Sequence, residues 1–214
     1  MPSPLNVDLV SDIICPWCFI GFVRLEEALT RTGATDAVLT LHPFQLDPST
    51  PSEGADLRER LAKRFGGAPA DVFRRVEAVA RESGIPLDYE KVRRFPNTLK
   101  AHTLLGAAKA RGSQRALART LFEAYFLREL DIGDPSVLAD LAAAHGFTRD
   151  EVLATLSDSS ALEATRQEAA ELSGQGISGV PFTIFEGKLA VSGAQGVEAF
   201  ASVIERARSA VKTG

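Results

Sequence analysis

The chain has only two cysteines, Cys15 and Cys18, and only Pro16 and Trp17 stand between them. Two thiols at this spacing suit one of three purposes: a structural disulfide bridge, half of a metal site, or a reactive dithiol. A bridge that closes so short a loop constrains the unfolded chain very little, so it adds little stability. This argues against a structural bridge.

A metal site would need further ligands, and the sequence offers few. A structural zinc site takes four ligands, usually with a second Cys or His pair at short spacing. The three histidines, His42, His102 and His145, are isolated from one another, so zinc would require two of them to converge in the fold. The cysteine count excludes a four-cysteine iron–sulfur cluster within one chain. We expect no metal, which leaves a redox dithiol or a cysteine pair without chemistry.

The elements around the cysteines are expected to form a β-α-β unit. Leu5–Ile14 is rich in aliphatic and β-branched residues, which is typical of a mostly buried strand. Apolar residues then recur at helical spacing from Pro16 up to a stop signal at Gly33, and a second strand pattern covers Ala37–Leu46. This order favours two parallel strands joined by a crossover helix.

Cys15 stands where the first strand ends and the helix begins. The unpaired N–H groups and the helix dipole at that end favour a thiolate, so Cys15 is expected to be the more acidic, exposed sulfur. Pro16 suits the first helical turn because its missing N–H costs nothing there. Cys18 follows one turn later and faces inward. This arrangement suits an attacking thiolate with a resolving thiol behind it.

Helical spacing dominates the middle of the chain. Thr148 with Glu151, and Ser160 with Glu163, form capping-box patterns that predict two helix starts. Gly84–Thr98 interrupts the helical pattern and is expected to be an extended connector. The other expected helical stretches are Ala55–Phe65, Pro69–Ser83, Thr98–Gly112, Gln114–Leu130 and Pro135–Gly146.

The end of the chain returns to strands. Phe182–Phe185 and Lys188–Val191 are short strand patterns joined by Glu186-Gly187, which suits a hairpin turn, and a helix is expected over Val197–Val211. An isolated hairpin is only marginally stable, so we expect both ends of the chain to share one sheet. This predicts an α/β fold with a discontinuous domain, residues 1–50 and 170–214, and an inserted helical domain, residues 51–169. Two consecutive domains are the alternative.

Three segments together resemble the DsbA family of thioredoxin-fold disulfide oxidoreductases, and more narrowly its FrnE-like branch. They are "SDIICPWCFIG", "FPNTLKAH" and the distant "SGVPFTIF". The resemblance implies a thioredoxin-like fold with an inserted all-helical domain. It also implies a cis peptide bond before Pro181, which would lie against the cysteine pair. The backbone of Val180 would then pair with an extended substrate chain, and Gly179 would allow close approach.

The resemblance also suggests roles for four polar residues. In thioredoxin-like proteins an acid beneath the dithiol helps to move the proton of the resolving thiol, and Asp12 or Asp8 is the candidate here. A solvated Asp12 at the strand end is the alternative. Asn97 and His102 would border the active-site cleft; a helix cap formed by Asn97 or Thr98, with His102 on an ordinary helix face, is the simpler interpretation.

The composition is that of an ordinary globular protein, with 45% hydrophobic and 24% charged residues. A net charge of −4 is too mild to predict a nucleic-acid or membrane partner. The sequence shows no targeting pattern and no apolar run long enough to span a membrane, which predicts a cytoplasmic location.

We therefore expect a thiol–disulfide oxidoreductase or isomerase with Cys15 as nucleophile and Cys18 as resolving thiol. Its partners would be protein or peptide thiols and disulfides. No cofactor would be bound, and glutathione is a candidate redox partner. One alternative is a glutathione-dependent transferase or 2-hydroxychromene-2-carboxylate isomerase, which share this fold and typically carry Ser in place of Cys15. The other is a non-enzymatic redox-sensing module.

Overall fold

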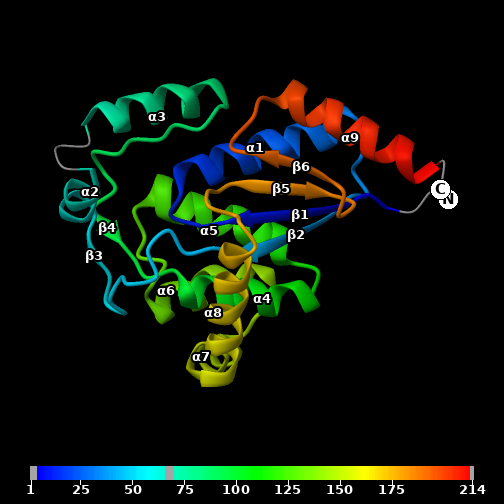
Figure 1. The fold of residues 1–214 in the computed structure, drawn as a ribbon. Coiled ribbons are helices and arrows are strands. Elements are labelled where there is room, and N and C mark those ends of the chain that lie inside the picture. Colours follow the sequence, from blue (N-terminus) through cyan, green and yellow to red (C-terminus); the bar gives the residue numbers. More distant parts are fainter. Residues whose placement is uncertain (1–3, 66–69, 213–214) are drawn as a thin grey trace.

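A four-stranded sheet combines the two ends of the chain, as predicted. The computed structural model describes residues 4–65 and 70–212. The sheet has the order β2-β1-β5-β6, with β1 parallel to β2 and the other two pairings antiparallel (Figure 1). The strands are β1 (Asn6–Ser11), β2 (Val38–Pro43), β5 (Phe182–Phe185) and β6 (Leu189–Ser192).

The ends of these strands are set by local backbone geometry. β1 is shorter than the predicted Leu5–Ile14, because the chain turns after Ser11 and the N–H of Cys15 donates to the carbonyl of Asp12 at 3.0 Å. The β5–β6 turn has positive φ at both Glu186 (52°) and Gly187 (62°). This conformation matches the twist of the flanking strands, so the hairpin forms where it was predicted.

Helices cover both faces of the sheet. α1 (Pro16–Arg31) and α9 (Val197–Lys212) lie side by side on one face, while α4 (Leu99–Ala110) and α8 (Ser159–Gly174) pack on the other, against β2 (Figure 1). The remaining elements are β3 (Ala55–Asp56), α2 (Leu57–Phe65), α3 (Ala70–Glu82), β4 (Arg94–Phe95), α5 (Gln114–Arg128), α6 (Pro135–Ala142), a single 3-10 turn (Ala143–His145) and α7 (Arg149–Ser157).

Aromatic side chains join the helical segment to the element that carries the cysteines. Phe19 on α1 stacks on Phe122 of α5, with ring centroids 5.3 Å apart, and also on Phe126. Tyr89, in the connector after α3, stacks on Phe73 of α3 and meets Phe126 edge-on. Contacts of this kind add to area burial. The helices after β2 therefore hold the start of α1 in place.

One glutamine closes the edge of the sheet. β2 is an edge strand, and such a strand presents unpaired N–H and C=O groups. The side chain of Gln114 accepts from the N–H of Leu41 at 3.0 Å and donates to its carbonyl at 2.9 Å. Both groups are buried, so α5 supplies the hydrogen bonds that a neighbouring strand would have made.

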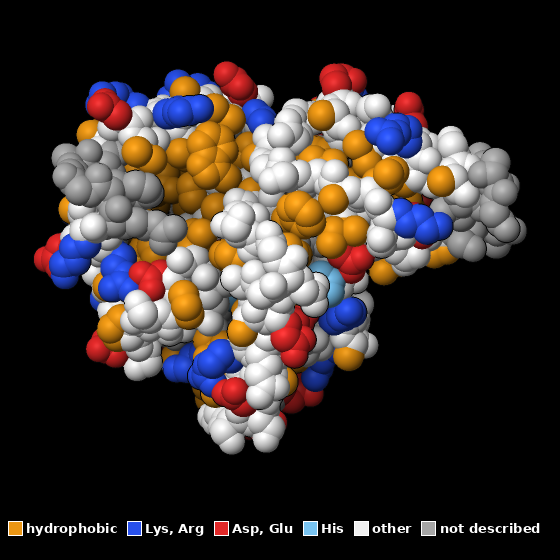
Figure 2. All heavy atoms as spheres, in the orientation of Figure 1, with side chains coloured by type: hydrophobic (Ala, Val, Ile, Leu, Met, Phe, Trp, Pro, Cys, Tyr) orange, Lys and Arg blue, Asp and Glu red, His pale blue; other side chains and the backbone are white. Residues whose placement is uncertain are grey.

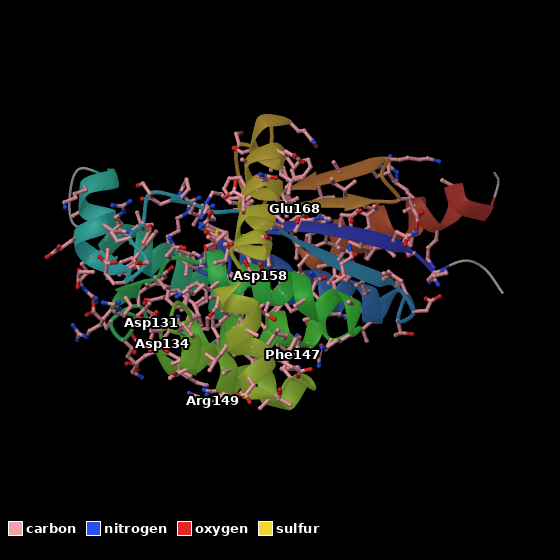
Figure 3. The ribbon with its side chains drawn as sticks, turned by 90° about the horizontal axis from the view of Figure 1, so that it is seen from below. Asp131, Asp134, Phe147, Arg149, Asp158 and Glu168 are labelled. Atoms are coloured by element: carbon pink, nitrogen blue, oxygen red, sulfur yellow. The ribbon has the colours of Figure 1, made fainter. Side chains whose placement is uncertain are left out.

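Two local predictions have different outcomes. The capping box of Thr148 with Glu151 is confirmed at the start of α7. The prediction for Ser160 with Glu163 is wrong, because α8 begins two residues earlier than such a box requires. Its N-cap is Asp158, which accepts from the N–H groups of Ser160 and Ala161. Figure 3 shows Asp158 at this junction. An aspartate side chain reaches these N–H groups directly, so the helix needs no box.

The connector contains no helix, as predicted, and most of it has no regular secondary structure. Its β4 pairs with β3 in a small two-stranded sheet that the sequence did not predict. Pro69, the first residue of one predicted helical stretch, lies outside the described residues. The division of the chain at residues 50 and 170 stays a prediction.

Candidate active site

The two cysteines meet at the start of α1. Cys15 is the N-cap residue and Pro16 occupies the first turn. The carbonyl of Cys15 accepts from the N–H groups of Cys18 at 3.0 Å and Phe19 at 3.2 Å, which places Cys18 one turn along the helix. The two cysteines are 3.5 Å apart, and both are free thiols. They are close enough to form a disulfide after a small movement.

Both thiols are buried, Cys18 more completely than Cys15. Cys18 is fully buried, and burial raises its pKa well above the usual value, helped by its hydrogen bond with Cys15 and by the charge of Cys15. Cys15 was expected to be exposed, but only 4% of it is accessible. It lies at the base of a cleft, and Ile14, Trp17 and Val180 line that cleft around it. Cys18 is therefore held as a thiol behind Cys15.

The loop before β5 covers the other side of Cys15. The Val180–Pro181 peptide bond is cis, and the Sγ atom of Cys15 lies 3.8 Å from the carbonyl oxygen of Val180. A Cβ atom added to Gly21 of α1 would lie 2.8 Å from Cγ of Pro181, so α1 and this loop pack tightly. A Cβ atom at Gly179 would meet nothing within 4 Å, which leaves open space beside the loop.

An apolar cleft with a volume of about 490 Å³ opens beside Cys15. Figure 2 shows hydrophobic side chains gathered below α3, on the face where this cleft opens. Three charged residues also line it: Arg60, Asp47, with which Arg60 is paired, and Lys63. Helical periodicity in the sequence indicated buried positions here and gave no sign of a cleft. The apolar walls come from α1, α2, α3 and the connectors: Trp17, Leu46, Leu57, Leu61, Val72, Phe73, Val76, Tyr89 and Phe95.

Asp12 and His102 form a buried pair behind the dithiol. The exposed fractions of their side chains are 1% and 3%, and Oδ1 of Asp12 is 3.3 Å from Nε2 of His102. Oδ2 of Asp12 accepts from the N–H of Leu46 at 2.8 Å. Burial is the main cause of the raised pKa of Cys18; a hydrogen bond from the backbone of Asp12 lowers this pKa, and the charge of Asp12 raises it by less. Asp12 is therefore a buried acid beside the resolving thiol, and the alternative of a solvated Asp12 is wrong.

Asp8 lies elsewhere. Oδ1 of Asp8 is 2.8 Å from Nε2 of His42, and Nδ1 of the same histidine is 2.8 Å from Oε1 of Glu168 on α8. The hydrogen bond with Glu168, followed by that with Asp8, raises the pKa of His42 against the effect of burial. Hydrogen bonding to His42 lowers the pKa of Glu168. The sequence assigned His42 no role, and no pattern in it predicted this cluster.

Asn97 has a structural position. Its Oδ1 accepts from the N–H of Leu99 at 3.0 Å, and its Nδ2 donates to the carbonyl of Thr50 at 2.7 Å. Asn97 therefore caps the start of α4 and ties it to the loop after β2. The side chain of Thr98 makes no capping hydrogen bond. Capping by Asn97, the simpler of the two interpretations, agrees with these contacts.

Over residues 4–65 and 70–212, no three side chains of His, Cys, Asp or Glu are placed to hold a metal ion. Within the same ranges, no helix is long and apolar enough to cross a membrane.

Comparison with known proteins extends over almost the whole chain. Residues 6–205 match the family model described as a DSBA-like thioredoxin domain. A probable DsbA oxidoreductase from Streptomyces coelicolor is 28% identical, covers 95% of this chain and 89% of its own, and superposes with a TM-score of 0.85. The match confirms the predicted thioredoxin-like fold with its helical insertion.

Two more distant structures share the fold. A 2-hydroxychromene-2-carboxylate isomerase has 18% identity and a TM-score of 0.69, covering 98% of this chain and 99% of its own. The cytosolic disulfide reductase DsbM from Pseudomonas aeruginosa, solved with glutathione, has 16% identity and a TM-score of 0.64, covering 98% of each chain.

Proposed function

Because this chain belongs to the family of DSBA-like thioredoxin domains, we propose that it is a thiol–disulfide oxidoreductase with Cys15 as nucleophile and Cys18 as resolving thiol. One observation carries the proposal: two free thiols 3.5 Å apart, with Cys15 as the N-cap of a 16-residue helix. Helix N-termini favour the thiolate that attacks a disulfide. Pro16 and Trp17 complete the CPWC motif and shape the first helical turn.

The reaction follows from the positions of the two sulfurs. The thiolate of Cys15 attacks one sulfur of a substrate disulfide, a new S–S bond forms, and the other substrate sulfur leaves as a thiolate that takes a proton from water. Cys18 then loses its proton and attacks Sγ of Cys15. The Cys15–substrate bond breaks and the second substrate thiol leaves. Two electrons pass from the cysteine pair to the substrate, and the steps reverse when the enzyme starts oxidised.

The second step needs a base, since burial raises the pKa of Cys18. Asp12 is the buried carboxylate beside Cys18, and we propose that it accepts the proton of this thiol. Asp8 is engaged with His42 and has no part in the proposal. Asn97 is likewise not one of the reacting groups, because its side chain accepts a hydrogen bond at the start of α4.

Protein or peptide disulfides are the proposed substrates. Val180 is beside Cys15, with open space at Gly179, and this backbone edge suits pairing with an extended chain. The apolar cleft would take a hydrophobic side chain of that substrate. Within the family, we assign the chain to the FrnE-like branch. We propose that it binds no cofactor and that glutathione is its redox partner. We also propose a cytosolic location, as for the Pseudomonas aeruginosa reductase.

A glutathione-dependent isomerase is the second candidate, because the 2-hydroxychromene-2-carboxylate isomerase shares the fold over 98% of this chain. The two candidates differ in their need for Cys18. An isomerase that uses bound glutathione needs no resolving thiol, whereas disulfide exchange between dithiol and substrate does.

Reduction of insulin by dithiothreitol, followed with the wild-type protein and with Cys15→Ser and Cys18→Ser, tests the proposal. We expect Cys15→Ser to abolish turnover and Cys18→Ser to accumulate a mixed disulfide that mass spectrometry detects. Full turnover by Cys15→Ser would refute the assignment. Glutathione-dependent isomerisation of 2-hydroxychromene-2-carboxylate that survives in Cys18→Ser would favour the second candidate. A reversible disulfide without turnover would favour a redox-sensing module.

A further inference from the structure

Within the described part of the chain, one side chain forms a hydrogen bond with the buried carboxylate of Asp12, and it is that of His102. The backbone N–H of Leu46 also donates to this carboxylate. Burying an ionised carboxylate is costly unless hydrogen-bond donors compensate it. A donor on Nε2 of His102 supplies one of these hydrogen bonds and fixes the position of the Asp12 carboxylate.

A second cavity lies behind this pair. It has a volume of about 210 Å³ and is lined by His102 together with His42, Lys109, Gln114 and Glu168. None of the residues that line it also lines the substrate cleft. Figure 3 shows Glu168 on α8, close to the strands that the helix crosses. His102 thus lies between Asp12 and a cavity that has polar and apolar walls and lies apart from the substrate cleft.

We propose that His102 is a positioning residue for proton transfer: its Nε2–H holds the carboxylate of Asp12 in place as the acceptor for the proton of Cys18. The inference rests on the proposed function. In the resolution step the Cys18 proton moves to Oδ1 or Oδ2 of Asp12, and the Cys18 thiolate attacks Sγ of Cys15. The substrate leaves as a thiolate, and Asp12 afterwards returns its proton to water. His102 neither gains nor loses electrons and does not touch the substrate.

Several charged or titratable groups face this pair. Cys18 of α1 and Tyr125 of α5 lie on the side of Asp12, since the charge of Asp12 contributes to the raised pKa of both after the larger effect of burial. On the side of the cavity are Glu168 of α8, His42 of β2 and Lys109 of α4. Glu168 and Asp8 both bond to His42, and Lys109 also lines this cavity.

The test follows the two thiols separately by stopped-flow with 5,5′-dithiobis(2-nitrobenzoate). Attack by Cys15 on this disulfide releases the first coloured thiolate, and resolution by Cys18 releases the second. The variants are His102→Phe, which removes the donor, and His102→Gln, which keeps an N–H but cannot titrate. His145→Phe is the matched control, because His145 bonds to Thr120 and lines neither the cleft nor the second cavity.

We expect His102→Phe to slow the second release about tenfold at pH 7, the loss of one hydrogen bond to a charged group. At higher pH the Cys18 thiol, whose pKa burial raises, depends less on a base to lose its proton, so the second release should recover. His102→Gln should lie closer to wild type, and the first release should stay within about twofold in every variant, as should both releases in His145→Phe.

An unchanged second release in His102→Phe, or a slowing by the same factor at every pH, would overturn the inference. Absence of the first release in the wild-type protein would instead overturn the proposed function. Should His102→Phe fail to fold, ¹⁵N NMR of the wild-type histidine decides. A protonated Nε2 that shifts when the dithiol is oxidised supports the inference, and a bare Nε2 contradicts it.

Discussion

Gly21→Ala tests how tightly α1 holds the loop that carries the substrate edge. The added Cβ atom would lie 2.8 Å from Cγ of Pro181 and 3.5 Å from Cα of Ala194. Moving Pro181 from 2.8 to an ordinary 3.4 Å means a shift of 0.6 Å, next to Val180 and Cys15. Overpacking of this kind costs about 1–3 kcal/mol, and alanine in place of glycine within a helix returns up to about 1 kcal/mol. We expect a net loss of about 1 kcal/mol.

Gly106→Ala is the matched control, because Gly106 also lies within a helix and an added Cβ atom there would meet nothing within 4 Å. This variant should gain about 0.5–1 kcal/mol, so urea unfolding should separate the two variants by roughly 2 kcal/mol. Insulin reduction should fall in Gly21→Ala alone, since only that variant moves the loop beside Cys15. Equal stability and equal turnover of the two variants would refute this picture of the packing.

Three further predictions concern stability. Gln114→Ala leaves buried groups of β2 unpaired and should lower the free energy of urea unfolding by about 2–4 kcal/mol; a loss below about 0.5 kcal/mol would contradict the role given to α5. Asp158→Ala should lower the free energy of unfolding by about 1 kcal/mol in the same assay, and Ser160→Ala by less than about 0.5 kcal/mol. The reverse order would favour the predicted capping box of Ser160 with Glu163. His42→Gln tests pH dependence: hydrogen bonding to Glu168 raises the pKa of His42, so its contribution is full below about pH 6.5 and is lost as the pH rises through the raised value. The loss of stability in His42→Gln should therefore become smaller as the pH rises. A loss that stays the same at every pH would contradict this role of His42.

The sequence predicted the framework of the site because its signals are local. The cysteine spacing, Pro16 at a helix start and the hairpin with Gly187 each depend on a few adjacent residues. The joining of both chain ends in one sheet followed from the instability of an isolated hairpin. The cis bond before Pro181 came from the family resemblance, since composition and spacing do not distinguish a cis from a trans bond.

The contacts that the sequence did not predict join residues far apart in the chain. His102 meets Asp12 across 90 residues, and Glu168 meets His42 across 126. No periodicity specifies which buried helix position faces a given strand end. The burial of Cys15 has the same origin, because distant segments, including α2, α3 and the Val180 loop, build the cleft around it.

The central claim is that Cys15 and Cys18 exchange between dithiol and disulfide. Trp17 stands between them and is the only tryptophan of the chain, so its fluorescence should report their redox state. We expect titration of the protein through glutathione redox buffers to give one two-electron transition, in which the emission changes and both free thiols disappear together. Emission that does not change, with two free thiols throughout the titration, would contradict the claim.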